Sequence, residues 1–117
     1  MKSIRNTAED ILLKCGCSPA LTGFEALRVA IEQVVLDPSR LNNVCKKLYP
    51  LVGAQLGIKD TTVRMHMWNA LDYVQDVNGH EAIMEAIGLK PNPRTGRYTV
   101  RGFIGAVAMK VRREVEG

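Results

Sequence analysis

Residues 50–76 read PLVGAQLGIKDTTVRMHMWNALDYVQD, and this segment carries the clearest structural signal in the chain. It predicts a short helix over about residues 50–56 and a tight turn over residues 57–60, where Gly57 supplies a permissive backbone. A longer helix then covers about residues 61–76. The segment therefore predicts two helices that follow one another across a sharp turn.

The spacing of apolar residues gives the longer helix one buried and one exposed face. We expect Asp60 or Thr61 to cap its start. A small residue in the short helix, Gly53 or Ala54, lets the two helices cross closely, and Ile58 fills the corner between them. The buried face is expected to consist of Val63, Met67, Ala70 and Leu71. The outward side chains are expected to be Thr61, Thr62, Arg64, Met65, Trp68, Asn69 and Asp72.

Two helices with this turn and spacing are typical of a helix-turn-helix, with a scaffold helix over about 50–56 and a recognition helix over about 61–76. In that motif, residues near the start of the recognition helix lie deepest in the major groove of DNA. The hypothesis is that Arg64 contacts guanine edges, or alternatively a phosphate, because a guanidinium matches the O6 and N7 acceptors of guanine. Thr62 and Asn69 would add supporting contacts from the same face.

The bulk properties indicate one ordinary globular domain. A chain of 117 residues fits a single domain, and 46% hydrophobic with 24% charged residues is a globular composition. No apolar run approaches the roughly 20 residues that cross a bilayer, and the first residues lack the apolar stretch of a secretory signal. We therefore expect a cytoplasmic protein with no membrane partner.

The rest of the chain reads as helices, without paired strands. Period-2 runs bounded by turn residues are absent from the sequence, so the predicted fold class is all-α, a compact bundle of about six helices. Beyond the central pair, helices are expected over about residues 4–15, over 23–36, from Asp37-Pro38 onward, over 80–87 with Gly88 at the end, and from the cap Thr99 onward.

Several helix ends can be predicted from single residues. Gly16 is placed to end the first helix through a left-handed cap. Thr22 and Glu25 have the spacing of a capping box at the start of the second helix. Asp37 is expected to cap the third helix, with Pro38 at its first position. The third helix is expected to turn four side chains toward the core: Leu41, Val44, Cys45 and Leu48.

The positive charge is concentrated in the last third of the chain. Sixteen basic and twelve acidic residues give a net charge of +4, and residues 90–113 contain seven basic residues and no acidic one. The segment 89–98 contains two prolines and a glycine, which favour an exposed loop. A phosphate-facing surface and a solvated face are both consistent with this pattern. The candidate phosphate contacts are Lys90, Arg94, Arg97 and Arg101.

The sequence contains no set of residues that indicates catalysis or a cofactor. Cys15, Cys17 and Cys45 lack the partners of a four-ligand zinc site and are expected to be free thiols. No acidic or cysteine set lies at ligand spacing around both His66 and His80. We therefore predict a protein that is not an enzyme and binds neither a metal nor a cofactor.

Residues along most of the chain match a known family in order and spacing. They are Ile11 with Gly16, the run LRVAI at 27–31, Leu48-Tyr49-Pro50, Val63 with Ala70, and Phe103-Ile104. From about residue 8 to residue 114, the chain resembles the C-terminal effector domain of the stage-zero sporulation response regulator of endospore-forming Firmicutes.

The resemblance implies a compact helical domain whose fourth and fifth helices form a helix-turn-helix. It implies a transcription regulator whose partner is double-stranded promoter DNA, often bound by two copies in tandem as a homodimer. The receiver domain that precedes this effector domain in the family lies outside the resemblance. A stand-alone relative and a fragment of a longer regulator both stay open.

The exposed face of the recognition helix departs from the family pattern. Met65 and Trp68 stand where the family carries arginine, and Arg64 stands where it carries an acidic residue. The operator sequence therefore does not transfer. Trp68 could touch a thymine methyl or a deoxyribose, or pack into a dimer or against a neighbouring segment. The expected DNA-binding residues are Lys59, Thr61, Thr62, Arg64, Met65, Trp68, Asn69, Lys90, Arg94, Arg97 and Arg101. The alternative is a protein-interaction module that binds a partner through Met65, Trp68 and Tyr73.

Overall fold

The computed structural model describes residues 3–117, and within them every regular element is a helix. This confirms the all-α class and the bundle of about six helices. The α-helices are α1 (Ile4–Lys14), α2 (Phe24–Leu36), α3 (Tyr49–Leu56), α4 (Asp60–Asn78), α5 (Glu81–Ile87) and α6 (Val100–Glu116). Between α2 and α3 lie a 3-10 helix, η1 (Pro38–Asn43), and a π-helix, η2 (Val44–Leu48).

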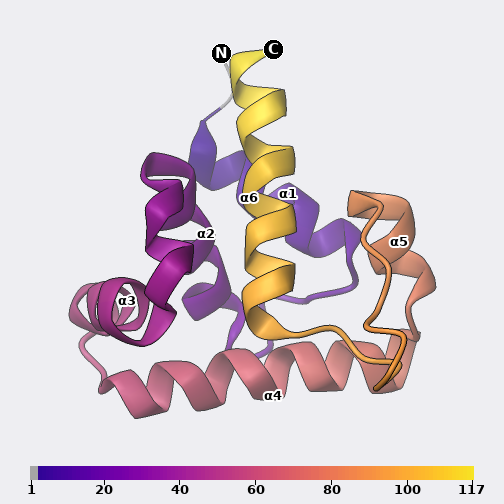
Figure 1. Cartoon of the computed structure of the whole chain (residues 1–117), viewed down its shortest axis with the longest axis horizontal. Helices are drawn as coiled ribbons and strands as arrows, with labels where there is room; N and C mark the ends of the chain where they lie inside the picture. Colours follow the sequence, from indigo (N-terminus) through magenta and orange to yellow (C-terminus); the bar gives the residue numbers. More distant parts are fainter. Residues whose placement is uncertain (1–2) are drawn as a thin grey trace.

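The core lies where α1, α2 and α6 pack against one another. An apolar stripe of α6 faces inward, with Phe103, Ile104, Val107, Ala108 and Val111 all buried. Figure 1 shows α4 as a long helix across the base of this core, with α3 above its N-terminal part and α5 near its C-terminal end. The outer side of α4 is exposed in its N-terminal part, at Thr61, Arg64, Met65 and Trp68.

Three predicted helix ends, at Gly16, Gly88 and Thr99, are confirmed. Gly16 has a φ of 91°, and the N–H groups of Gly16 and Cys17 donate to the carbonyl oxygens of Leu13 and Leu12 at the end of α1. Gly88 ends α5 with a φ of 68°, and the Thr99 hydroxyl accepts a hydrogen bond from the N–H of Gly102 at the start of α6. Each residue satisfies backbone groups that a helix end otherwise leaves unpaired.

The predicted capping box before α2 is wrong. Gly23 occupies the cap position, and no side chain accepts a hydrogen bond there. The Glu25 carboxylate instead accepts from Arg28, which also donates to Glu32 one turn later. Arg28 is buried, so the two carboxylates compensate a charge that would otherwise be costly to desolvate. Glu25 therefore forms an ion pair with Arg28 and does not accept hydrogen bonds from the first N–H groups of α2.

The third predicted helix is irregular, and this changes which residues it buries. Asp37 caps its start as expected, through the N–H of Ser39. The chain then forms the 3-10 helix η1 and the wider π-turn of η2. A π-turn has more residues per turn than an α-helix, so the apolar spacing read from the sequence loses its phase. Leu48 is buried, but Cys45, predicted to face the core, is exposed.

The other two cysteines lie in the core. Cys15 and Cys17 are buried and free. Burial raises the pKa of the Cys15 thiol to about 12, with a smaller contribution from Cys17, and burial raises the pKa of Cys17 to about 11. Both therefore stay protonated at neutral pH and act as small apolar side chains.

The turn between α3 and α4 depends on two glycines. Gly57 has a φ of 70°, which favours glycine, and it ends α3 as predicted. A Cβ on Gly53 would lie 2.6 Å from the carbonyl oxygen of Ile58, so Gly53 is the small residue that lets the chain fold back. The N-cap of α4 is Lys59 and no side chain caps it, which corrects the expectation for Asp60 or Thr61.

A third glycine positions α4 against α2. A Cβ on Gly23 would lie 2.1 Å from the carbonyl oxygen of His66 and 2.7 Å from the Cβ of Ala70. The start of α2 therefore rests directly on the backbone of α4. At the other end of α4, the Asn78 side chain donates to the carbonyl oxygen of Gly16 over 3.3 Å. These contacts fix the helix at two points along its length.

Replacing Gly23 with alanine should destabilise the fold. The backbone of Gly23 is right-handed helical, which alanine adopts without strain. The lower conformational entropy of the unfolded chain would by itself make the alanine variant more stable by about 0.4–1 kcal/mol. Because the new methyl group would collide with backbone atoms of α4, we expect a loss of about 1–3 kcal/mol instead. Urea unfolding followed by circular dichroism measures the difference.

Thr22→Ala is the matched control at the neighbouring position. The Thr22 side chain is exposed and does not cap α2, so its removal should change the free energy of unfolding by less than about 0.5 kcal/mol. A Gly23→Ala variant as stable as the wild type would show that α4 does not rest on α2 as described.

Candidate nucleic-acid interface

The exposed face of α4 is the one that its apolar spacing predicts. The side chains of Val63, Met67, Ala70 and Leu71 are buried, with at most 3% of their surface exposed. The side chains of Arg64, Met65, Trp68 and Asn69 are exposed. The helix phase is therefore confirmed, although the helix begins one residue earlier and ends two residues later than predicted.

We call residues 60–69 the reading half of α4. Thr61 is exposed at its start beside the exposed Lys59, whereas Thr62 is half-buried and turns partly toward the core. Two cations, Lys59 and Arg64, stand against one carboxylate, Asp60, in this region. Asp60 lies in the first turn, where the helix dipole favours a negative charge.

Large apolar side chains share this outer face with the polar ones. Met65 is 52% exposed and Trp68 is 58% exposed, and Tyr73, one turn further, is 52% exposed. Exposed apolar side chains are common when they stand singly, and several on one helix form a candidate contact surface.

The second half of α4 carries negative charge that the protein compensates internally. Asp72 and Asp76 both accept hydrogen bonds from the guanidinium of Arg97, which lies in the loop of residues 88–99. The hydrogen bond to Asp76, with a length of 2.9 Å, contributes most to raising the pKa of Arg97. Arg97 therefore holds the loop on α4.

The buried side-chain amide of Gln75 helps to hold the same loop in place. The N–H of Tyr98 donates to Gln75 Oε1 over 2.7 Å, and the Tyr98 hydroxyl donates to the carbonyl oxygen of Leu89. His80 packs edge-on against the Tyr98 ring, with centroids 5.1 Å apart. The loop is thus fixed beside the C-terminal part of α4, at the opposite end from α3 (Figure 1).

The four basic residues predicted to face phosphate fall into two pairs. Lys90 and Arg94 are exposed in the loop. Arg97 is occupied by Asp72 and Asp76, and the Arg101 Nε donates to the carbonyl oxygen of Leu41 over 2.7 Å. Arg97 and Arg101 are thus committed to intramolecular contacts that the sequence did not indicate.

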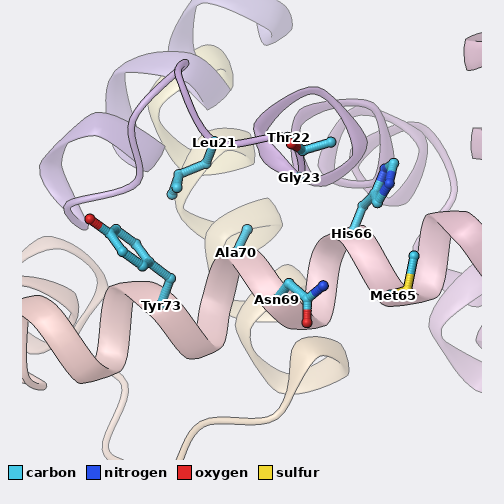
Figure 2. A pocket seen from close by; sticks show the side chains of 8 residues that line it. All are labelled: Leu21, Thr22, Gly23, Met65, His66, Asn69, Ala70 and Tyr73. Carbon is cyan, nitrogen blue, oxygen red and sulfur yellow. The ribbon is translucent and has the colours of Figure 1, made fainter.

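A groove runs beside the reading half of α4. Figure 2 shows Leu21, Thr22 and Gly23 on one side, and Met65, His66, Asn69, Ala70 and Tyr73 of α4 on the other. Its volume is about 410 Å³. His66 is the one imidazole in this lining, and its backbone is the part of α4 on which Gly23 rests.

Sequence reasoning missed the residues that hold the interface in shape. Three residues each contact a segment that is distant in sequence: Gln75, Asn78 and Gly23. Of these, only Gly23 could have been noticed in the sequence, because a glycine directly before a helix is a position where another segment can approach closely. Polar residues near the end of a long helix are otherwise expected in solvent. Their tertiary partners cannot be read from local spacing.

Residues 3–117 contain neither a cluster of metal ligands nor a helix suited to a membrane. No group of three or more histidine, cysteine, aspartate or glutamate side chains in that range is arranged to hold a metal ion. None of its helices combines the length and the apolar character that crossing a membrane requires.

The comparison with known families agrees with this arrangement. The family described as "Sporulation initiation factor Spo0A C terminal" matches residues 8–111. The match includes α2, α3, α4 and α5 in full and most of α1 and α6. The chain therefore belongs to the Spo0A C-terminal family of sporulation initiation factors, whose members are DNA-binding effector domains and not enzymes.

Proposed function

We propose that this domain binds double-stranded DNA in a sequence-specific way and regulates transcription, with α3 and α4 as a helix-turn-helix. The observation that carries the proposal is the outer face of the reading half of α4. It presents Arg64 and Asn69 to solvent, while the opposite face is buried against α2 and α3. A helix held on one side and exposed on the other fits the major groove, which is about 12 Å wide.

Each exposed side chain of the reading half suits a different contact. Arg64 matches guanine O6 and N7, and Asn69 can pair with adenine N6 and N7. Met65 and Trp68 offer apolar surface to a thymine methyl group. Lys59 and Thr61, at the start of the helix, are placed for phosphates, and the partly turned Thr62 adds at most a supporting contact.

Lys90 and Arg94 supply the phosphate contacts of the loop. Arg97 and Arg101 act indirectly, because their guanidinium groups hold the loop and the start of α6 in place. Contacts to phosphate position a protein on the duplex without selecting bases.

The assembly on a promoter is a pair of copies in tandem, and the protein acts in the cytoplasm, where bacterial DNA lies.

A second candidate function is a protein-interaction module that uses Met65, Trp68 and Tyr73. Their joint exposure on one helix supports it. The two functions differ in salt dependence, because binding dominated by phosphates weakens steeply with salt and an apolar protein interface does not.

Arg64→Ala should remove one base preference and leave general affinity largely intact. The preferred sequence comes first from selection out of a random duplex library with the wild-type protein. The variant should then lose about 1–3 kcal/mol at one preferred base pair, because a bidentate arginine contact is worth that much. Fluorescence anisotropy with the selected duplex, single-base variants and a random duplex measures this.

The outcome for random DNA decides the role of Arg64. Equal loss on selected and random duplexes would make Arg64 a phosphate contact. If the wild type binds no duplex even at low salt, the proposal of DNA binding fails and the protein-interaction function replaces it.

Neutralising Lys90 and Arg94 together should weaken binding to all duplexes alike. The slope of log affinity against log salt should become shallower by about 1.8, because each phosphate that is no longer neutralised removes about 0.9 from it. The control is Lys110→Gln with Arg113→Gln, which removes the same charge from the part of α6 far from α4. A slope that stays at the wild-type value in Lys90→Gln with Arg94→Gln would remove the loop from the interface.

A further inference from the structure

Three consecutive exposed residues lie one residue before the start of α3, and none of them takes part in the proposed base contacts. They are Cys45, Lys46 and Lys47, within the π-turn η2. The wider turn of η2 leaves Leu48 as its one buried residue and turns this pair of lysines outward.

The position of η2 links it to the reading half of α4. Tyr49 follows η2 directly, and its ring is buried. Burial raises the pKa of the Tyr49 hydroxyl, Cys45 raises it further, and the Arg64 guanidinium lowers it. η2 leads into α3 through Tyr49, and α3 packs against α4 above its N-terminal part (Figure 1), so η2 lies on the side of the domain that carries the reading half.

The two lysines line a shallow depression beside the start of α3. Its volume is about 440 Å³, and its lining consists of Asp37, Ser39, Arg40, Lys46, Lys47, Pro50 and Leu51. Arg40 is already engaged, since it donates to the backbone and side-chain oxygens of Gln33. The Asp37 carboxylate is likewise engaged by Ser39.

No described residue accepts a hydrogen bond from the side chain of Lys46 or Lys47, although the hydrogen bonds from Ser39 and, to a smaller extent, the charge of Lys47 lower the pKa of Asp37. Among residues 3–117, neither forms an ion pair. A lysine ammonium is a compact charge on a flexible stem, which suits a phosphate oxygen at variable distance better than a base edge that requires fixed geometry. This pair of charges is therefore matched to the phosphodiester backbone.

We propose that Lys46 and Lys47 bind phosphates of the DNA backbone beside the N-terminal end of α4. The inference rests on the proposed function and adds a backbone contact to those already proposed at the start of α4 and at the loop. The 19 residues of α4 extend over about 28 Å at 1.5 Å per residue. Lys46 and Lys47 at one end, with Lys90 and Arg94 at the other, would hold the helix in the groove from both ends.

The test is the double variant Lys46→Gln with Lys47→Gln. Binding is measured by fluorescence anisotropy with the selected duplex and with a random duplex, over a series of salt concentrations. We expect the salt slope to become shallower by about 1.8, and the affinity for both duplexes at low salt to fall by the same factor. Base preferences should not change, and neither should the thermal midpoint, because both side chains are exposed.

The charge-matched control is again Lys110→Gln with Arg113→Gln. If that control makes the slope equally shallow, the effect belongs to net charge and the inference is overturned. A wild-type slope in the Lys46→Gln, Lys47→Gln variant overturns it as well, while leaving the proposed function intact. Absence of any duplex binding by the wild type would overturn the proposed function and this inference together.

Discussion

The close approach of Gly23 to the backbone of α4 is the constraint on which the interface depends. A hydrogen atom in place of a side chain lets the start of α2 touch the carbonyl of His66. This contact, together with the buried Val63 and Met67, fixes which side of α4 faces inward. The outward direction of Arg64 and Trp68 follows from it. Any change that separates α2 from α4 would shift α4 relative to the rest of the domain, and all the proposed base-contacting side chains would shift with it.

Charge divides α4 into two halves with different roles. In the second half, Asp72 and Asp76 would repel phosphates if they were unpaired, and Arg97 compensates both while it holds the loop in place. The reading half lacks that compensation and keeps Arg64 exposed. A basic residue far along the chain therefore neutralises carboxylates beside the proposed interface, and the positive charge left for a polyanionic partner is smaller than composition suggests.

The sequence predicted the helices better than their contacts. The phase of α4 and the ends at Gly16 and Gly88 follow from local rules, namely apolar spacing and the preference of glycine for positive φ. The outward turn of Cys45 could not be predicted, because the π-turn breaks the spacing on which the prediction relied. The ion pairs of Arg97 could not be predicted either, because Asp76 and Asp72 lie 21 and 25 residues away, beyond the reach of local patterns.

A nuclear magnetic resonance titration of the isotope-labelled protein with a short duplex at low salt tests the central claim most directly. Backbone amide shifts should concentrate in residues 57–69, with further changes in η2 and in the loop of residues 88–99. Amides of the outer turns of α1 and the C-terminal half of α6 should stay in place. Shifts confined to α1 and α6, or no shifts at any duplex concentration, would contradict the assignment of α4 as the helix that reads DNA.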